Sequence, residues 1–185
     1  MIRRTATEHH EKFRKKGERP ALEVAESYYV AYLTYFLAKD DPRKETQEIQ
    51  MYLAEVKREL GKSKEASELY RRVVDSRDSR YAKEAGALWT AALSEAIKKS
   101  GDNSKAPEPS ALEREYVEAA DQLQDALGET AEGREAALRA AQVLAGYSNT
   151  RKDAQKRARK IIDKAPRTPQ ALTSARLLVQ LQAEN

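Results

Sequence analysis

Two adjacent histidines near the N-terminus are the first residues whose type could support metal binding or acid–base chemistry. His9 and His10 lie in a polar stretch, residues 2–16, that we expect to be helical. Neighbouring residues on a helix point about 100° apart, so the two imidazoles would not share a metal ion. We therefore expect a solvated terminal helix. Only three of its residues could be buried: Ile2, Ala6 and Phe13.

Other catalytic or ligand-binding patterns are missing from the sequence. The 185 residues include no cysteine, which excludes disulfides, thiolate metal sites and cysteine nucleophiles. The 30 Asp and Glu residues lie beside compensating Lys and Arg, so no carboxylate pair stands out as a catalyst. There is no Gly-rich phosphate loop and no Ser with a His and Asp partnership. We expect no enzyme activity, no catalytic residue, no metal and no cofactor.

The composition is that of an all-helical protein. Only 7 residues are Gly and 6 are Pro, whereas 35% are charged. Ala, Glu, Lys, Leu and Arg dominate, and isolated β-branched pairs are the only strand signal. The apolar spacing along the chain predicts about eight to nine helices.

Charge is balanced over the whole chain but segregated along it. The 34 basic and 30 acidic residues give a net charge of +4, which is too small to indicate nucleic-acid binding. Residues 108–135 are mostly acidic, and residues 151–167 are mostly basic. Such blocks can steer the approach of a partner.

Residues 48–78 have the pattern of two amphipathic helices joined by a turn. Gly61 suits the left-handed residue that follows a helix, and Ser63 could cap the next helix with its hydroxyl. Two helices with one-sided stripes and a short turn pack antiparallel. The two stripes are Ile49, Tyr52, Leu53, Val56 and Leu60, and then Ala66, Leu69, Tyr70, Val73 and Val74.

This hairpin resembles a tetratricopeptide repeat, a helix–turn–helix unit of about 34 residues with small and aromatic residues at fixed places. The small position is taken by Ala66 and the aromatic one by Tyr70, with Leu53 and Gly61 also matching. There are two departures from the family pattern: Gln50 stands where Trp is frequent, and Asp78 where Pro is frequent.

Residues 134–166 resemble a second, divergent unit. Ala154 takes the small position, Ala158 replaces the aromatic residue, and Pro166 ends the unit. The resemblance implies a right-handed α-solenoid of antiparallel helix pairs. It also implies a protein-interaction scaffold or adaptor that holds a protein segment in the concave surface lined by the first helix of each unit.

A narrower similarity concerns residues 70–85, which are similar to the repeat junctions of bacterial cell-envelope tetratricopeptide proteins. This similarity implies a subunit of a bacterial multiprotein complex, with the cell envelope as one candidate location. The apolar run 27–38 is shorter than the ~20 residues of a membrane helix, and the N-terminus lacks an apolar signal core. We expect a cytoplasmic chain, or a periplasmic one if it is a domain of a longer exported protein.

The stretch 21–39 is the most apolar helix expected in the chain. Leu22, Ala25, Tyr29, Leu33 and Phe36 form one face. A helix that is apolar nearly all round is usually buried between neighbours, and an aromatic groove for a partner helix is the alternative. A second aromatic face comprises Tyr28, Tyr32 and Tyr35.

The remaining segments complete one continuous domain. We expect an N-terminal extension at 1–19, a front half at 20–100, a linker loop at 101–109 and a back half at 110–185. Ser110 and Glu113 predict a capping box, and Thr150 and Thr168 predict two further caps. In the last helix four residues are expected to be buried: Leu172, Ala175, Leu178 and Val179. Two could stay partly exposed: Leu177 and Leu181.

Three hypotheses for function follow. The resemblance places the partner-binding surface on Glu48, Met51, Glu55, Arg58 and Glu59, with Trp89 beyond if its side chain is exposed. A second hypothesis is nucleic-acid binding through the basic helix, although that strip lacks aromatics for base stacking. A third is a structural homo-oligomer in which the acidic and basic blocks pair between copies. The candidate residues of the basic helix are Lys152, Lys156 and Arg159.

Overall fold

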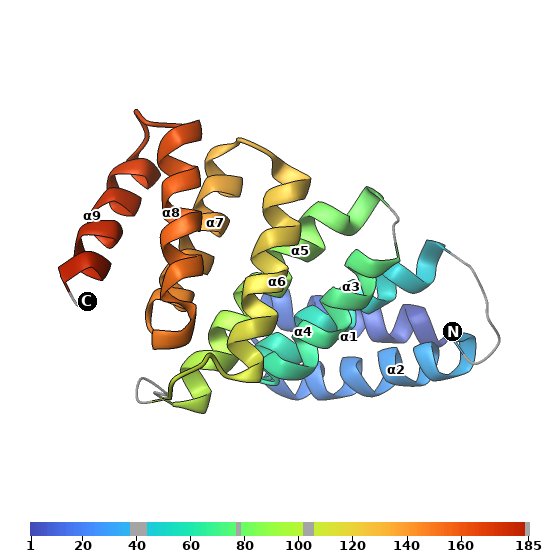
Figure 1. The fold of residues 1–185 in the computed structure, drawn as a ribbon. Coiled ribbons are helices and arrows are strands. Elements are labelled where there is room, and N and C mark those ends of the chain that lie inside the picture. The colour runs from blue at the N-terminus through green and yellow to red at the C-terminus, as the bar shows by residue number, and fades with distance from the viewer. Residues whose placement is uncertain (38–43, 77–78, 102–105, 184–185) are drawn as a thin grey trace. The chain divides into compact units, whose positions relative to one another are not determined.

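The structure, a computed structural model, describes residues 1–37, 44–76, 79–101 and 106–183. These residues form nine α-helices, one 3-10 turn and no strand (Figure 1). The predicted all-α class with eight to nine helices is confirmed.

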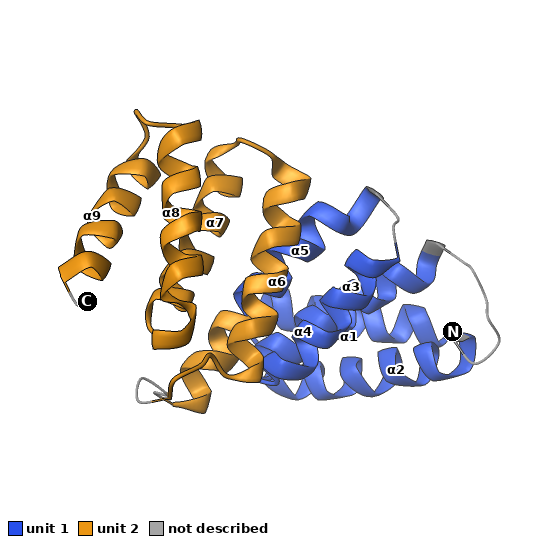
Figure 2. Cartoon of the chain, in the orientation of Figure 1, with its two compact units in different colours: residues 1–92 blue, residues 93–185 orange. Residues whose placement is uncertain are grey.

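The chain divides into two compact units, residues 1–92 and 93–185 (Figure 2). The boundary falls inside α5 (Ser79–Ser100), so residues 1–19 belong to the first packed unit. The predicted division at a linker of residues 101–109 stays a prediction, because residues 102–105 lie outside the described part. Asp78 and the predicted helix end at residue 39 also lie outside the described part, so what was expected of them stays a prediction.

The first unit contains α1 (Ile2–Lys16), α2 (Arg19–Leu37), α3 (Lys44–Glu59), α4 (Ser63–Asp75) and the start of α5. α1 packs on α2, α2 on α3, and α3 on α4, and short connections make such neighbours antiparallel. Gly17 (φ 68°) and Gly61 (φ 80°) end α1 and α3 in the left-handed region, as predicted for Gly61. The largest fully buried side chains of this unit are Leu22, Tyr29, Ile49, Val56, Tyr70, Val73 and Trp89.

The second unit contains the end of α5, α6 (Ala111–Leu127), α7 (Ala131–Ala145), η1 (Ser148–Thr150), α8 (Arg151–Lys164) and α9 (Pro169–Ala183). α6 packs on α7, α7 on α8, and α8 on α9, while α7 also contacts α9. No described helix is long and apolar enough to cross a membrane.

Local capping sets where these helices begin, and two predicted caps are wrong. The capping box of Ser110 and Glu113 is present, and Thr168 accepts a hydrogen bond from the backbone N–H of Ala171 at 3.2 Å. Ser63 is the first residue of α4, and the N-cap position is taken by Lys62. Thr150 precedes α8, but its hydroxyl donates to the carbonyl oxygen of Leu144 at 2.6 Å instead of accepting from α8.

The buried faces of the two terminal helices differ from the expectation. Leu172 and Val179 are exposed, whereas Leu181 is buried with Ala171 and Ser174, because α8 covers the neighbouring face of α9. In α1 the side chain of Ile2 is exposed and His10 is buried, because α1 packs along α2 through the face that carries Ala6 and His10.

Candidate functional site

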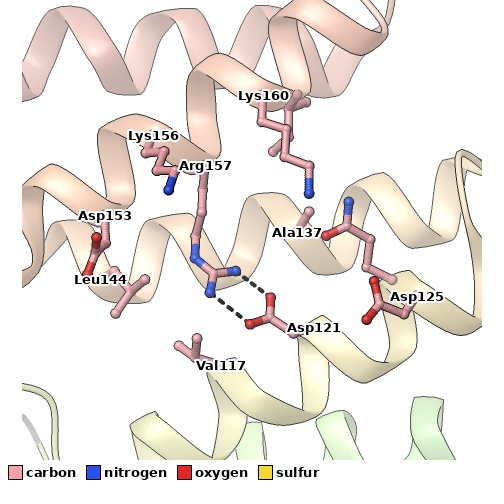
Figure 3. Close-up of a pocket in the computed structure, with 11 residues that line it drawn as sticks. Val117, Asp121, Asp125, Ala137, Leu144, Asp153, Lys156, Arg157 and Lys160 are labelled. Carbon is pink, nitrogen blue, oxygen red and sulfur yellow. Dashed lines mark hydrogen bonds and ion pairs between the residues drawn. The ribbon is translucent and has the colours of Figure 1, made fainter.

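A groove of about 600 Å³ lies within the second unit, between α6 and α8, with α7 at its base (Figure 3). Each of the three helices contributes side chains to its lining. These are Val117, Asp121, Gln124 and Asp125 of α6, Ala137 and Leu144 of α7, and Asp153, Lys156, Arg157, Lys160 and Ile161 of α8.

The floor of the groove is apolar because α7 presents an alanine and a leucine side chain to it. Ala137 lies in a buried cluster with Leu138 and Ile161, and Leu144 packs in a second cluster that includes Val117. An alanine cannot fill the space between two flanking helices, so a hollow remains above it. Thr130, which accepts a hydrogen bond from the backbone N–H of Gly133 at 3.1 Å, sets the start of α7.

One ion pair crosses the groove. The guanidinium of Arg157 on α8 donates two hydrogen bonds to the carboxylate of Asp121 on α6, one of them at 2.7 Å (Figure 3). This bidentate hydrogen bonding raises the pKa of Arg157 above its ordinary value, against the opposing effect of burial. The pair holds the two walls at a set separation.

The charges that remain on the walls differ between the two sides. Lys156 and Lys160 line the α8 wall and form no ion pair within the described residues, and Asp125 is exposed on the α6 wall. Lys164, at the end of α8, is paired with Glu129 at 2.8 Å. The acidic and basic blocks of the sequence are therefore partly neutralised within the chain, and two lysines stay available to a ligand.

The candidate residues of the basic helix are placed together on α8. Lys156 lines the groove, and Lys152 and Arg159 are exposed on the adjoining face of the same helix, next to Lys160 and Lys164. No aromatic side chain lines that face. The groove could not be predicted from the sequence, because Asp121 on one wall is 36 residues from Arg157 on the other.

Two of the candidate residues on α3 already form ion pairs with side chains of α1. Glu48 pairs with Arg3 at 2.9 Å, and Glu55 pairs with Arg14 at 2.6 Å. Met51 is buried. Arg58 and Glu59 border a hollow of about 160 Å³ next to His10 and Arg14. Trp89 is fully buried with the Arg71 guanidinium 5.6 Å from its ring centroid, so the exposure that its proposed anchor role required is missing.

His10 is the residue that the sequence analysis placed wrongly in solvent. Its ring makes edge-on contacts with Tyr29 and Tyr52 at 6.1 and 6.2 Å between centroids. Burial, together with the positive charge of Arg14, lowers the pKa of His10 to about 4, against the opposing charge of Glu11. The i, i+4 spacing from Ala6 was the signal that could have predicted its burial. In the described residues no group of three or more potential metal ligands gathers.

Comparisons with known proteins agree with this fold. No protein-family model matches the sequence, and no curated protein matches it. Solved structures do match: the nearly identical TPR-like repeats of a putative kinesin light chain from Podosopora anserina align with 98% of this chain and 86% of that one, at 15% identity and TM-score 0.56. A variant of the same repeats aligns at TM-score 0.54 and 15% identity, over 95% of this chain and 84% of that one.

A bacterial structure matches equally well. A tetratricopeptide repeat protein from Parabacteroides merdae aligns with 98% of this chain at 15% identity and TM-score 0.56, and the alignment covers 61% of that protein. These likenesses concern the fold, and they confirm the predicted tetratricopeptide-like architecture.

Proposed function

From a tetratricopeptide-like fold we propose that this chain is a non-catalytic protein-interaction module, and that the groove between α6 and α8 receives a segment of its partner. The observation that carries the proposal is an apolar floor between walls of different charge. Interaction sites commonly combine apolar anchors with charged rims that set register.

The dimensions of the groove suit a short peptide segment. Its lining on α6 runs from Val117 to Asp125, a length of about 12 Å at 1.5 Å per residue. That length corresponds to roughly two turns of a helix or four residues of an extended strand. The apolar side chains of such a segment would contact Val117, Leu144 and Ile161.

The charges of the walls favour an acidic segment. Lys156 and Lys160 would attract Asp or Glu residues on the side of the segment that faces α8. Asp125 would repel acidic residues on the side of the segment that faces α6. Arg157 is already bound to Asp121 and would keep the walls apart without contributing a free charge. The preferred ligand is a segment with apolar anchors and carboxylates along one edge.

A peptide selection tests this proposal directly. A phage-displayed library of random 12-residue peptides is selected on the full chain, and the best clone is synthesised with a fluorescein label for anisotropy titration. We expect enriched peptides to combine apolar residues with Asp or Glu. Lys156→Glu with Lys160→Glu should weaken binding about ten-fold or more, whereas Lys152→Glu, on the same helix but outside the groove, should change it less than about two-fold.

Other outcomes would contradict the proposal. Equal losses from the groove variant and from Lys152→Glu would indicate attraction to the whole basic face. Steeply salt-dependent binding of a 20-nucleotide single-stranded DNA, lost with Lys152, Lys156 and Arg159, would favour the nucleic-acid hypothesis. Membership of a bacterial or envelope complex stays a prediction from the residue 70–85 similarity alone.

A further inference from the structure

The bidentate pair of Asp121 and Arg157, which we call the central ion pair, divides the groove of the second unit into two halves (Figure 3). On each wall a series of groove-lining residues recurs every four positions, so the members of a series share one face of their helix. The central ion pair joins the middle member of one series to the middle member of the other. The two series are Val117, Asp121 and Asp125 on α6, and Asp153, Arg157 and Ile161 on α8.

The half of the groove beside Val117 is filled from below. Leu144 of α7 lies in a buried cluster with Ala154 of α8, and Val117 of the α6 wall packs against that cluster. Figure 3 shows Val117, Leu144 and Asp153 together on this side of the central ion pair. The apolar floor is therefore continuous from wall to wall here, and a long ligand side chain finds no hollow.

The other half of the groove is open above Ala137. The buried cluster of Ala137 contains Leu138 and Ile161, and it includes no described side chain of α6. The side chain of Ala137 ends at its Cβ, so space remains between this floor and Gln124 on the α6 wall. This half can receive one bulky apolar side chain, which would contact Ala137 and Ile161.

The charges of the α8 wall also differ between the two halves. In the filled half the lining includes both Lys156 and Asp153 of α8. In the open half Lys160 lies on the same side of the central ion pair as Ala137, and the acidic residue of the lining, Asp125, belongs to the opposite wall (Figure 3). The α8 wall is therefore purely basic only beside the hollow above Ala137, which favours a carboxylate next to the side chain that fills it.

We infer that the ligand of this groove is an extended segment with one bulky apolar residue, the anchor, above Ala137 and an acidic residue beside Lys160. A small residue of the segment lies over the central ion pair. The inference rests on the function proposed above and names the sequence pattern that the groove selects.

The central ion pair decides between an extended and a helical ligand. An α-helix is about 10 Å across with its side chains, too wide to reach the floor while the pair bridges the walls. An extended chain crosses the pair with a single small residue. Four residues of each wall span about 6 Å, or roughly two residues of an extended chain, and alternate residues of such a chain point to the same side. The anchor and the small residue are therefore two positions apart.

A double-mutant cycle between chain and peptide tests the anchor. The parent peptide is the fluorescein-labelled 12-residue peptide selected on the unchanged chain, and each of its apolar residues is replaced by alanine in turn. One replacement should weaken binding to the unchanged chain about ten-fold or more, as expected for one buried side chain. Ala137→Leu, which fills the hollow, should weaken the parent peptide about ten-fold, and the same alanine replacement should then cost less than about two-fold.

A second variant keeps this test independent of any effect of Ala137→Leu on folding. Gln124→Trp fills the same hollow from the α6 wall at a half-buried position, and it should weaken the parent peptide about as much. Gln122→Trp, half-buried on the same helix but outside the groove lining, is the matched control and should change binding less than about two-fold. Ala126→Leu, exposed on α6, is the corresponding control for Ala137→Leu. Circular dichroism compares the helix content of all four variants.

The small residue over the central ion pair has its own test. Replacing the residue two positions from the anchor by leucine should weaken binding to the unchanged chain about five-fold or more, because the leucine collides with the pair. On a chain with both Asp121→Ala and Arg157→Ala, the leucine peptide and the parent peptide should bind within about two-fold of each other. A leucine peptide that binds the unchanged chain as well as the parent does contradicts the predicted register.

Failure of this inference differs from failure of the proposed function. If no peptide is enriched, or if Lys156→Glu with Lys160→Glu leaves binding unchanged, the groove is not the binding site and both proposals fall. If those lysine substitutions weaken binding but Ala137→Leu and Gln124→Trp do not, only the anchor above Ala137 is wrong. Losses spread evenly over all alanine replacements in the peptide, or a peptide that becomes helical on binding, would likewise overturn the inference.

Discussion

Arg157 of α8 and Asp121 of α6 form a bidentate ion pair across the groove of the second unit, 36 residues apart in sequence (Figure 3). The pair is partly exposed, with 29% and 40% of the two side chains accessible. Such a pair contributes more to stability than a single exposed contact, because both hydrogen bonds are made in one geometry.

A double-mutant cycle on Asp121→Ala and Arg157→Ala should give a coupling free energy of about 1 kcal/mol. Urea unfolding followed by circular dichroism measures it. The exposed i, i+4 pair of Arg139 and Glu135, at 3.0 Å, is the control and should give about 0.3 kcal/mol. Equal couplings for both pairs would mean that the contact across the groove has no special strength.

Gly133→Ala should destabilise the second unit, because a Cβ at that position would collide with the carbonyl oxygen of Gly128. Backbone must then shift where α6 and α7 meet, and we expect a loss of about 1–3 kcal/mol. Gly146→Ala is the control, since its backbone is helical and a Cβ there meets only an ordinary contact. Thermal unfolding of both variants compares them; a higher melting temperature for Gly133→Ala would contradict the packing described here.

Trp89→Ala should cost about 3–5 kcal/mol of unfolding free energy, since the side chain is fully buried and its removal leaves a cavity. Because Trp89 is the sole tryptophan of the sequence, circular dichroism should follow the unfolding. Leu172→Ala, at an exposed position, should cost less than about 0.5 kcal/mol. A small effect of Trp89→Ala would mean that this side chain is not part of the core.

Glu26→Gln should destabilise the first unit at neutral pH by about 1–2 kcal/mol, because the carboxylate accepts hydrogen bonds from both Lys57 and Lys62. Burial tends to raise the pKa of Glu26, but these hydrogen bonds and positive charges outweigh it and lower the pKa below 4.5. The contribution is thus present above pH 4.5 and is lost as the pH falls through the lower folded-state pKa. Glu23→Gln, exposed on the same helix, is the matched control and should show no such loss.

Acidification should destabilise the first unit through His10. Its pKa is about 4 in the folded chain, against an ordinary value of 6.5 for histidine, so the unfolded chain binds more protons between these values. Stability therefore falls as the pH drops from 6.5 to 4, by up to about 3 kcal/mol. Measured from pH 7.5 to 4 by urea unfolding, the slope in this window should be smaller in His10→Gln.

Two features keep that experiment specific to His10. Glu55, which faces His10 from α3, has its pKa raised by burial despite the positive charge of Arg14, so its protonation acts in the opposite direction. Glu55 is present in both chains, and the difference between them therefore isolates the histidine. His9→Gln should keep the slope of the unchanged protein, and an unaltered slope in His10→Gln would show that His10 titrates normally.

The sequence by itself determined the helices and the pairing within two hairpins, residues 48–78 and 134–166. The signals that specify the helices are local and do not depend on tertiary contacts. They are the period of apolar residues, the positive φ of Gly61, and the capping box of Ser110 and Glu113. The all-α class and the tetratricopeptide-like pattern of the hairpins follow from these local signals.

Only the tertiary structure decided which face of each helix is buried and which charges meet. In α9 two apolar stripes compete, and packing against α8 buries Leu181 while Leu172 stays exposed. In α1 a histidine takes a core position because two tyrosines of other helices surround it. Asp121 of α6 and Arg157 of α8 meet across the groove that Ala137 and Leu144 of α7 help to line. Burial and pairing across helices depend on neighbours that are distant in sequence, and local periodicity carries no information about them.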